Sequence, residues 1–116
     1  MSNTMFECTK EASYILWEHT QESNTLDLWY CAEDIARYFE KKDIMDRETV
    51  YATMNMNTYN SEYVAFVREI AYRLYVYSGC DDDLTNWYIA ERLLTISEWL
   101  DALIKMASVY RIKNTD

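Results

Sequence analysis

The sequence has almost none of the residues that usually build turns in sheets. Among its 116 residues there is one glycine, Gly79, and there is no proline. Antiparallel sheets and α/β loops commonly need both residues at their turns, so this shortage favours helices joined by short polar connections. No run approaches the roughly 20 apolar residues of a membrane span, and no membrane segment is expected. Half of the residues are hydrophobic, which is enough to form the core of one domain.

Basic residues and histidine are also scarce. The chain has 11 Lys and Arg against 20 Asp and Glu, a formal net charge of −9, and one histidine, His19. A surface of this sign repels phosphates, so a basic protein is a better partner than nucleic acid itself. Three cysteines, Cys8, Cys31 and Cys80, lack metal-site spacing and leave one unpaired in any disulfide scheme. The unpaired cysteine favours a reducing compartment, and the start of the sequence has no basic, apolar leader, so we expect a cytoplasmic protein. No bound metal or cofactor is expected.

The residues that are present form a repeat. The stretch 26–35 recurs 58 residues later (position 26 to position 84), and the match extends upstream. The identical pairs are Glu11/Glu69, Tyr14/Tyr72, Leu16/Leu74, Leu26/Leu84, Trp29/Trp87, Tyr30/Tyr88, Ala32/Ala90 and Glu33/Glu91. Repeated large aromatic residues are more often duplicated packing than duplicated chemistry. We therefore expect Trp29, Ala32, Trp87 and Ala90 to form the core of each repeat, with the alanines allowing a neighbouring helix to approach.

The spacing of apolar residues predicts helices over about 5–22, 26–42, 46–54 and 61–79. Gly79 suits the left-handed residue that ends a helix, and Asn24 or Thr25, Asp46 and one aspartate of 81–83 suit helix caps. Residues 84–110 fit either one long helix or two joined near 95–97. The predicted fold is a single all-α domain over 1–116, a compact bundle of five to six helices. Its two related helical hairpins (repeat one 5–56, repeat two 61–111) are expected to pack about a pseudo-two-fold axis.

One charged surface stands out. In the predicted first helix, Glu7, Glu11, Glu18 and Glu22 share an arc about 60° wide and form a row about 22 Å long. None has a basic residue four positions later, and unpaired like charges cost a few tenths of a kcal/mol. A solubilising face is one interpretation of this acidic row. The other is a ridge, spaced like backbone phosphates, that enters a basic groove. Three further acids, Asp81, Asp82 and Asp83, form a secondary acidic patch.

Catalytic patterns are weak. Glu33 and Glu91 recur beside a core face and suit a carboxylate pair for acid–base work or a metal, but a half-exposed structural role, with Arg37 four residues after Glu33, is the better explanation. His19 has no nucleophile beside it and lies on the apolar side of its helix. No Gly-rich phosphate loop, HExxH pattern or EF-hand register is present. We do not predict an enzyme.

Two local resemblances add expectations. The block from Val67 to Glu91, with its Ala-Tyr-x-Leu helix, Gly/Asp turn and Asp83-Leu84-x-x-Trp87-x-x-Ala90-Glu91, resembles a short bacterial helical-hairpin family of unknown function. That resemblance covers about a quarter of the chain and implies helical hairpins without an activity. Residues 25–35, together with the small, acidic, proline-free character, are similar to a helix of the phage DNA-mimic anti-restriction proteins of the Ocr type. This second resemblance covers about a tenth of the chain and implies an acidic inhibitor.

The sequence thus predicts a small non-enzymatic binding protein that blocks a basic nucleic-acid-binding surface of a larger host protein. The expected setting is a phage or mobile-element anti-defence protein of anti-CRISPR or anti-restriction type, working in the host cytoplasm on a nuclease or nucleic-acid-binding complex. The alternative is a bacterial helical module for self-association or docking, and the oligomeric state is open between them. No membrane partner is expected.

Overall fold

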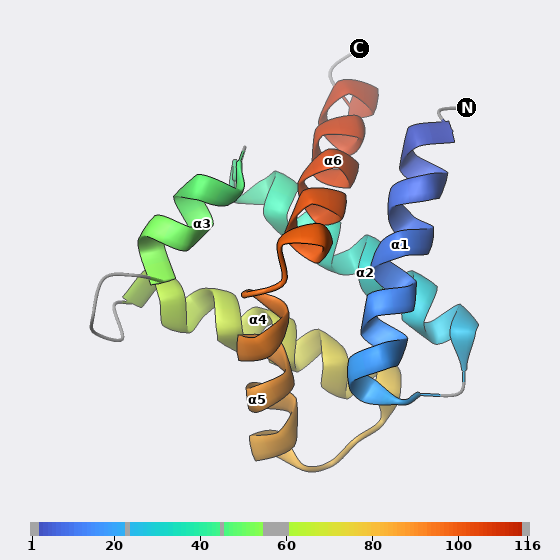
Figure 1. Cartoon of the computed structure of the whole chain (residues 1–116), viewed down its shortest axis with the longest axis vertical. Coiled ribbons are helices and arrows are strands. Elements are labelled where there is room, and N and C mark those ends of the chain that lie inside the picture. Colours follow the sequence, from blue (N-terminus) through green and yellow to red (C-terminus); the bar gives the residue numbers. More distant parts are fainter. Residues whose placement is uncertain (1–2, 23, 45, 55–60, 115–116) are drawn as a thin grey trace.

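The computed structural model describes residues 3–22, 24–44, 46–54 and 61–114, and these residues form an all-helical protein (Figure 1). In chain order the helices are α1 Asn3–Thr20, α2 Thr25–Lys41, α3 Arg47–Met54, α4 Ser61–Ser78, α5 Asp83–Leu93 and α6 Ser97–Asn114. No strand occurs in the described ranges. The predicted fold class is therefore confirmed, with six helices at the upper end of the expected number. None of these helices is long and apolar enough to cross a membrane.

The turns after α1 and α4 are built in the same way. Each helix is followed directly by a residue with positive φ, Gln21 (56°) after α1 and Gly79 (72°) after α4. The N–H of each of these residues donates to the carbonyl four residues back. The next helix is then capped by a side-chain oxygen, from Asn24 for α2 and Asp82 for α5, which accepts two backbone N–H groups. These side chains satisfy donors that a helix start leaves unpaired. Gly79 and the caps match the sequence analysis, whereas the end of α1 at Thr20 falls two residues before the predicted Glu22.

The region 84–110 is two helices. The N–H of Thr95 donates to the carbonyl of Arg92, and the N–H of Ile96 donates to that of Leu93, each reaching back only three residues. This tightening ends α5 and lets the chain turn into α6, while Leu93 and Leu94 at the turn are fully buried. The break therefore lies inside the core and not in a solvent-exposed linker.

α6 occupies the centre of the core. It packs along both α1 and α2, and Figure 1 shows α6 and α1 side by side with α2 crossing behind them. On α6 the buried residues are Trp99, Leu100, Ala102, Leu103, Met106, Ala107 and Tyr110. They meet Leu16 of α1 and Ile35 and Phe39 of α2, all fully buried. α4 packs against α2 on one side and α5 on the other.

The packing of the six helices does not show the expected pseudo-two-fold arrangement. In a two-fold arrangement, α3 would pack along α4 and α5 in the way that α6 packs along α1 and α2. Instead α3 is a short helix at the edge, which touches α4 and α6 and contributes one buried residue, Val50. The resemblance between the two halves is thus visible in the hairpin turns but not in the way the hairpins are covered. The duplication itself stays a prediction.

Candidate functional site

The acidic row is shorter in the structure than the sequence predicts. Glu7, Glu11 and Glu18 are exposed on α1, where they span about 16 Å at about 1.5 Å per residue. Glu22 lies beyond the helix end, where its Oε1 accepts the N–H of Asn24 at 3.1 Å. Because Gln21 adopts the left-handed conformation, the 100° step per residue does not carry through to Glu22. The row on α1 therefore has three members, and Glu22 belongs to the turn.

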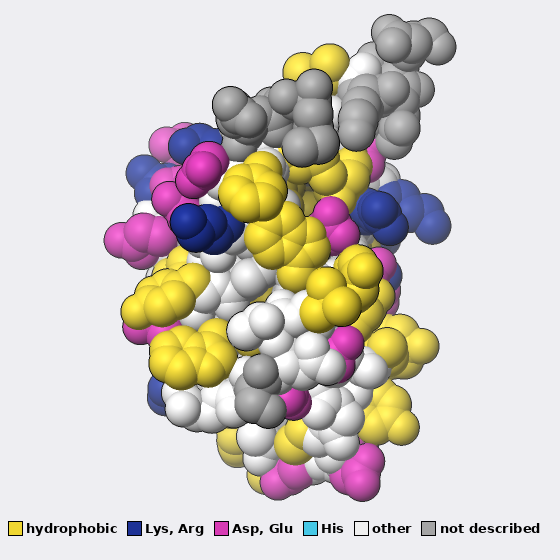
Figure 2. Space-filling model, turned by 90° about the vertical axis from the view of Figure 1, so that its right-hand side faces the viewer, with side chains coloured by type: hydrophobic (Ala, Val, Ile, Leu, Met, Phe, Trp, Pro, Cys, Tyr) yellow, Lys and Arg dark blue, Asp and Glu magenta, His cyan; other side chains and the backbone are white. Residues whose placement is uncertain are grey.

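Exposed aromatic rings lie beside this row. Tyr14 and Trp17 are 59% and 41% exposed, and their rings stack with centroids 6.0 Å apart. Phe6, 48% exposed, packs at 5.3 Å against Trp29 of α2. Figure 2 faces the side of the molecule where α1 lies, and hydrophobic side chains are spread over it with acidic ones between them. The outer face of α1 thus combines negative charge with aromatic surface.

The two repeated tryptophans lie at the edge of the core, and Trp87 packs against it. Ala32 and Ala90 are fully buried, whereas Trp29 and Trp87 are only partly buried and line surface grooves. The groove at Trp29 has a volume of about 330 Å³, and the groove at Trp87 has one of about 230 Å³. The small alanines lie inside the core, whereas the large indoles on the adjacent face reach the surface. Among the four tryptophans, Trp99 is the one that is fully buried.

The grooves on the two hairpins are lined by corresponding positions. The Trp87 groove, between α4 and α5, is lined by Arg68, Ala71, Tyr72, Tyr75, Asp83, Asn86 and Trp87. Each of these lies 58 positions after a residue lining the two adjoining grooves of α1 and α2, which are Lys10, Ser13, Tyr14, Trp17, Thr25, Leu28 and Trp29. The sequence repeat therefore places similar aromatic surface on both hairpins. That surface, and not the core alone, is what the repeated tryptophans and tyrosines form.

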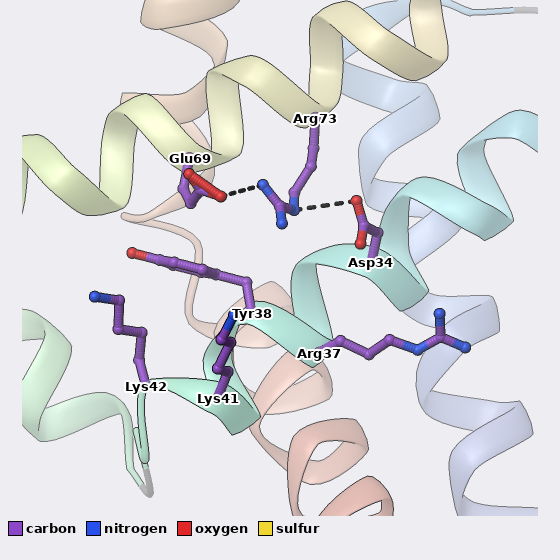
Figure 3. Close-up of a pocket in the computed structure, with 7 residues that line it drawn as sticks. All are labelled: Asp34, Arg37, Tyr38, Lys41, Lys42, Glu69 and Arg73. Atoms are coloured by element: carbon purple, nitrogen blue, oxygen red, sulfur yellow. Dashed lines mark hydrogen bonds and ion pairs between the residues drawn. The ribbon is translucent and has the colours of Figure 1, made fainter.

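A third surface was not anticipated from the sequence. A groove of about 430 Å³ lies between α2 and α4, lined by Asp34, Arg37, Tyr38, Lys41, Lys42, Glu69 and Arg73. Figure 3 shows Arg73 reaching from α4 toward α2, with Glu69 on one side, Asp34 on the other and Tyr38 below. Arg37 and Lys41 are four residues apart on α2, and a search of the sequence for basic residues at helical spacing would have found them. Arg73 joins them only because α4 packs on α2.

Arg73 is the centre of this groove. Its Nε lies 3.1 Å from Oδ2 of Asp34, its Nη1 forms an ion pair with Glu69, and its guanidinium carbon is 5.6 Å from the centroid of the Tyr38 ring. The side chain is 17% exposed. Burial, and then the charges of Glu69 and Glu62, raise the pKa of Tyr38 to about 12, so its hydroxyl is protonated at neutral pH. The groove thus contains an oriented guanidinium edge and a neutral phenol.

Glu33 and Glu91 have separate partners on different helices. Oε2 of Glu91 accepts the hydroxyl of Tyr63 on α4 at 2.9 Å. Burial, and then the negative charge of Glu33, raise the pKa of Tyr110 on α6. Among the residues that the structure describes, no group of three or more His, Cys, Asp and Glu side chains is arranged to hold a metal ion. Each glutamate therefore interacts with a tyrosine of another helix, Glu91 with Tyr63 and Glu33 with Tyr110.

The remaining predicted residues are placed individually. Asp81, Asp82 and Asp83 are all exposed, and Asp82 is the cap of α5, where hydrogen bonds from Thr85 lower its pKa. His19 is partly exposed near the end of α1. The three cysteines are free thiols: Cys8 and Cys31 are buried and Cys80 is partly exposed. Of these residues, only the aspartates offer a charged surface.

Comparison of the chain with protein-family models, with curated proteins and with solved structures finds no match.

Proposed function

We propose that this chain is a small non-enzymatic binding protein whose α1 face occupies a basic, nucleic-acid-binding surface of a larger protein. The observation that carries the proposal is the combination on one face of Glu7, Glu11 and Glu18 with the exposed rings of Tyr14 and Trp17. Complementary charge raises association rates and selects partners, while buried tyrosine and tryptophan supply most of the binding energy in many interfaces. The net charge of −9 adds long-range attraction to a basic partner.

The proposed setting is inhibition of a host defence nuclease, of restriction or CRISPR type, by a phage or mobile-element protein. Two features support it: the likeness of residues 25–35 to a DNA-mimic helix, and the three exposed glutamates on one face of α1. In this setting the protein works in the host cytoplasm and contacts neither nucleic acid nor membrane directly. It competes with nucleic acid for the same basic surface.

The test is capture of the partner with charge-reversed variants. Tagged protein is incubated with host lysate and washed at low and at high salt, and captured proteins are identified by mass spectrometry. We expect a basic nucleic-acid-binding protein to be retained at low salt and shed at high salt. The variant Glu11→Lys/Glu18→Lys should lose it, with the same helicity by circular dichroism.

The matched control is Glu48→Lys/Glu98→Lys, which reverses two exposed acids on α3 and α6. Each double variant changes the net charge from −9 to −5, because each Glu→Lys reversal adds two charges. If both variants lose the partner equally, overall charge and not the α1 face is responsible, and the proposed role of the acidic row is wrong. If the Glu11/Glu18 variant keeps the partner, the row has no part in binding.

The corresponding aromatic grooves favour one alternative, a module for self-association or docking. Exposed tyrosine, tryptophan and leucine on two similar hairpins are the kind of surface that a second copy or a larger assembly covers. Light scattering after size-exclusion chromatography distinguishes the two functions. A dimer that dissociates on Trp29→Ala favours self-association, whereas a monomer at every concentration tested counts against it.

A further inference from the structure

The groove between α2 and α4 gathers positive charge in an otherwise acidic protein. Four of the chain's 11 basic residues line it, Arg37, Lys41, Lys42 and Arg73, together with two acidic ones. Arg37 points away from the other three in Figure 3, and its guanidinium carbon lies 5.2 Å from the centroid of the Tyr110 ring. The remaining three cations and two carboxylates give the groove a local balance of +1, while the chain as a whole carries −9. A local excess of this sign attracts a small anion even when the rest of the molecule is negative, because charges beyond the Debye length of about 8 Å are largely screened at physiological salt.

We propose that this groove binds the phosphate group of a small phosphorylated compound. Lys41 and Lys42 are exposed at the end of α2, and within the described residues neither ammonium group has a carboxylate partner. Figure 3 shows the Lys42 ammonium near the Tyr38 hydroxyl and the Lys41 ammonium below the other end of the Tyr38 side chain. Ammonium groups and a phenol O–H along one side of a groove are donors that a phosphate with several acceptor oxygens can use.

Arg73 completes the donor set. Its two ion pairs use Nε and Nη1, and in Figure 3 the third guanidinium nitrogen points into the groove toward Tyr38. The carboxylates of Asp34 and Glu69 therefore orient the guanidinium before a ligand arrives, which lowers the entropy lost on binding. Tyr38 keeps its proton, with a pKa of about 12, and its hydroxyl is a donor at neutral pH.

The size and surroundings of the groove favour a small ligand over a polynucleotide. Its volume of about 430 Å³ lies within the range of small-molecule sites, roughly 300–1,000 Å³. A nucleic-acid strand would extend past the four basic side chains onto a surface where acids exceed bases. A single phosphate or diphosphate places its charge where the positive side chains are and avoids that repulsion.

A simpler role for Lys41 and Lys42 is to complement the negative end of the α2 dipole. That role needs no ligand and predicts that pyrophosphate does not bind. The two explanations therefore differ in a direct binding measurement.

In the experiment, the protein is titrated separately with inorganic pyrophosphate, with adenosine diphosphate and with a short single-stranded oligonucleotide. Binding is measured by calorimetry and by changes in the amide chemical shifts of the protein. We expect saturable one-to-one binding of pyrophosphate and of the nucleotide, with shifts concentrated in the last turn of α2 and the middle of α4. Lys41→Gln/Lys42→Gln should weaken binding about tenfold or more, as expected for lost charge-assisted hydrogen bonds.

The control variant Lys10→Gln/Lys105→Gln removes two exposed lysines from α1 and α6 and makes the same change in net charge. It should bind pyrophosphate as the unmodified protein does. The proposal is overturned if pyrophosphate does not bind, if both lysine pairs weaken binding equally, or if the oligonucleotide binds more tightly than pyrophosphate. Both variants keep the acidic row and the aromatic residues Tyr14 and Trp17 of α1 unchanged, so the outcome is independent of the proposed inhibitor function.

Discussion

Replacing Arg73 with methionine tests how much the α2–α4 contact depends on one cation. Arg73 joins the two helices through Asp34 and stacks over Tyr38, and it also pairs with Glu69 on its own helix. Methionine keeps much of the apolar stem and removes the charge. The substitution therefore isolates the ionic and hydrogen-bonded part of the contact, while the two carboxylates are left facing each other without a counter-charge.

The size of the effect follows from burial. Breaking a fully buried ion pair costs about 3–5 kcal/mol, whereas an exposed pair contributes about 0–1 kcal/mol. Arg73 is 17% exposed, but Asp34 and Glu69 are 33% and 36% exposed, so water partly replaces the lost partner. We expect Arg73→Met to lower the free energy of unfolding by about 2 kcal/mol. For a domain of this size that corresponds to a decrease in Tm of about 8 °C.

The assay is thermal and urea unfolding followed by circular dichroism, with Arg47→Met as the control. Arg47 pairs with Asp101 at 3.3 Å, but both side chains are 46% exposed, so its removal should cost about 0.5 kcal/mol or less. A double-mutant cycle with Asp34→Asn should show a coupling of about 1 kcal/mol. If Arg73→Met and Arg47→Met destabilise the protein equally, burial does not strengthen the Arg73 contacts and the reasoning is wrong.

Two further predictions concern the backbone and the alkaline limit of stability. Gly79→Ala should lower the free energy of unfolding by about 1 kcal/mol because φ is +72°, although an added Cβ meets no atom within 4 Å. Gln21→Gly at the corresponding turn should stabilise the protein, because Gln21 also has a positive φ. Equal effects of the same sign in urea melts would contradict this reasoning. Burial raises the pKa of Cys31 from 9.0 and that of Tyr38 from 10.0, each to about 12, so the folded state holds these protons more tightly than the unfolded state. Their contribution to stability is complete below pH 9 and is lost as pH rises toward 12, by about 1.4 kcal/mol per pH unit for each group that has ionised in the unfolded state. Urea melts from pH 8 to 11 should show this decline, and Cys31→Ala/Tyr38→Phe should flatten it; an unchanged slope would assign the decline to other groups.

Local signals in the sequence predicted the helices well because helix ends are decided by a few neighbouring residues. Asn24 and Asp82 offer side-chain oxygens to backbone N–H groups two and three residues later, and Gly79 takes the left-handed conformation without strain. The end of α1 was missed because Gln21 adopts the same conformation with no glycine to indicate it. One consequence was that Glu22 was assigned to the acidic row, although the row stops at Glu18.

The surfaces were harder to predict because burial depends on which helices meet. Trp29 and Trp87 are large and repeated, and such residues usually pack inside. Here the alanines at 32 and 90 are fully buried, and the indoles line grooves at the surface. The repeat is therefore as much a pattern of exposed aromatic residues as a pattern of core.

The sequence by itself determined an all-helical chain, the positions of most helix ends and the excess of negative charge. These properties depend on composition and on residues within one or two helical turns of each other. The tertiary structure alone decided that α6 packs along α1 and α2, that α3 lies at the edge instead of packing along α4 and α5, and that Arg73 meets Asp34 and Tyr38. Those outcomes depend on packing between residues far apart in the chain, where side-chain volume and the crossing of whole helices decide which faces are buried.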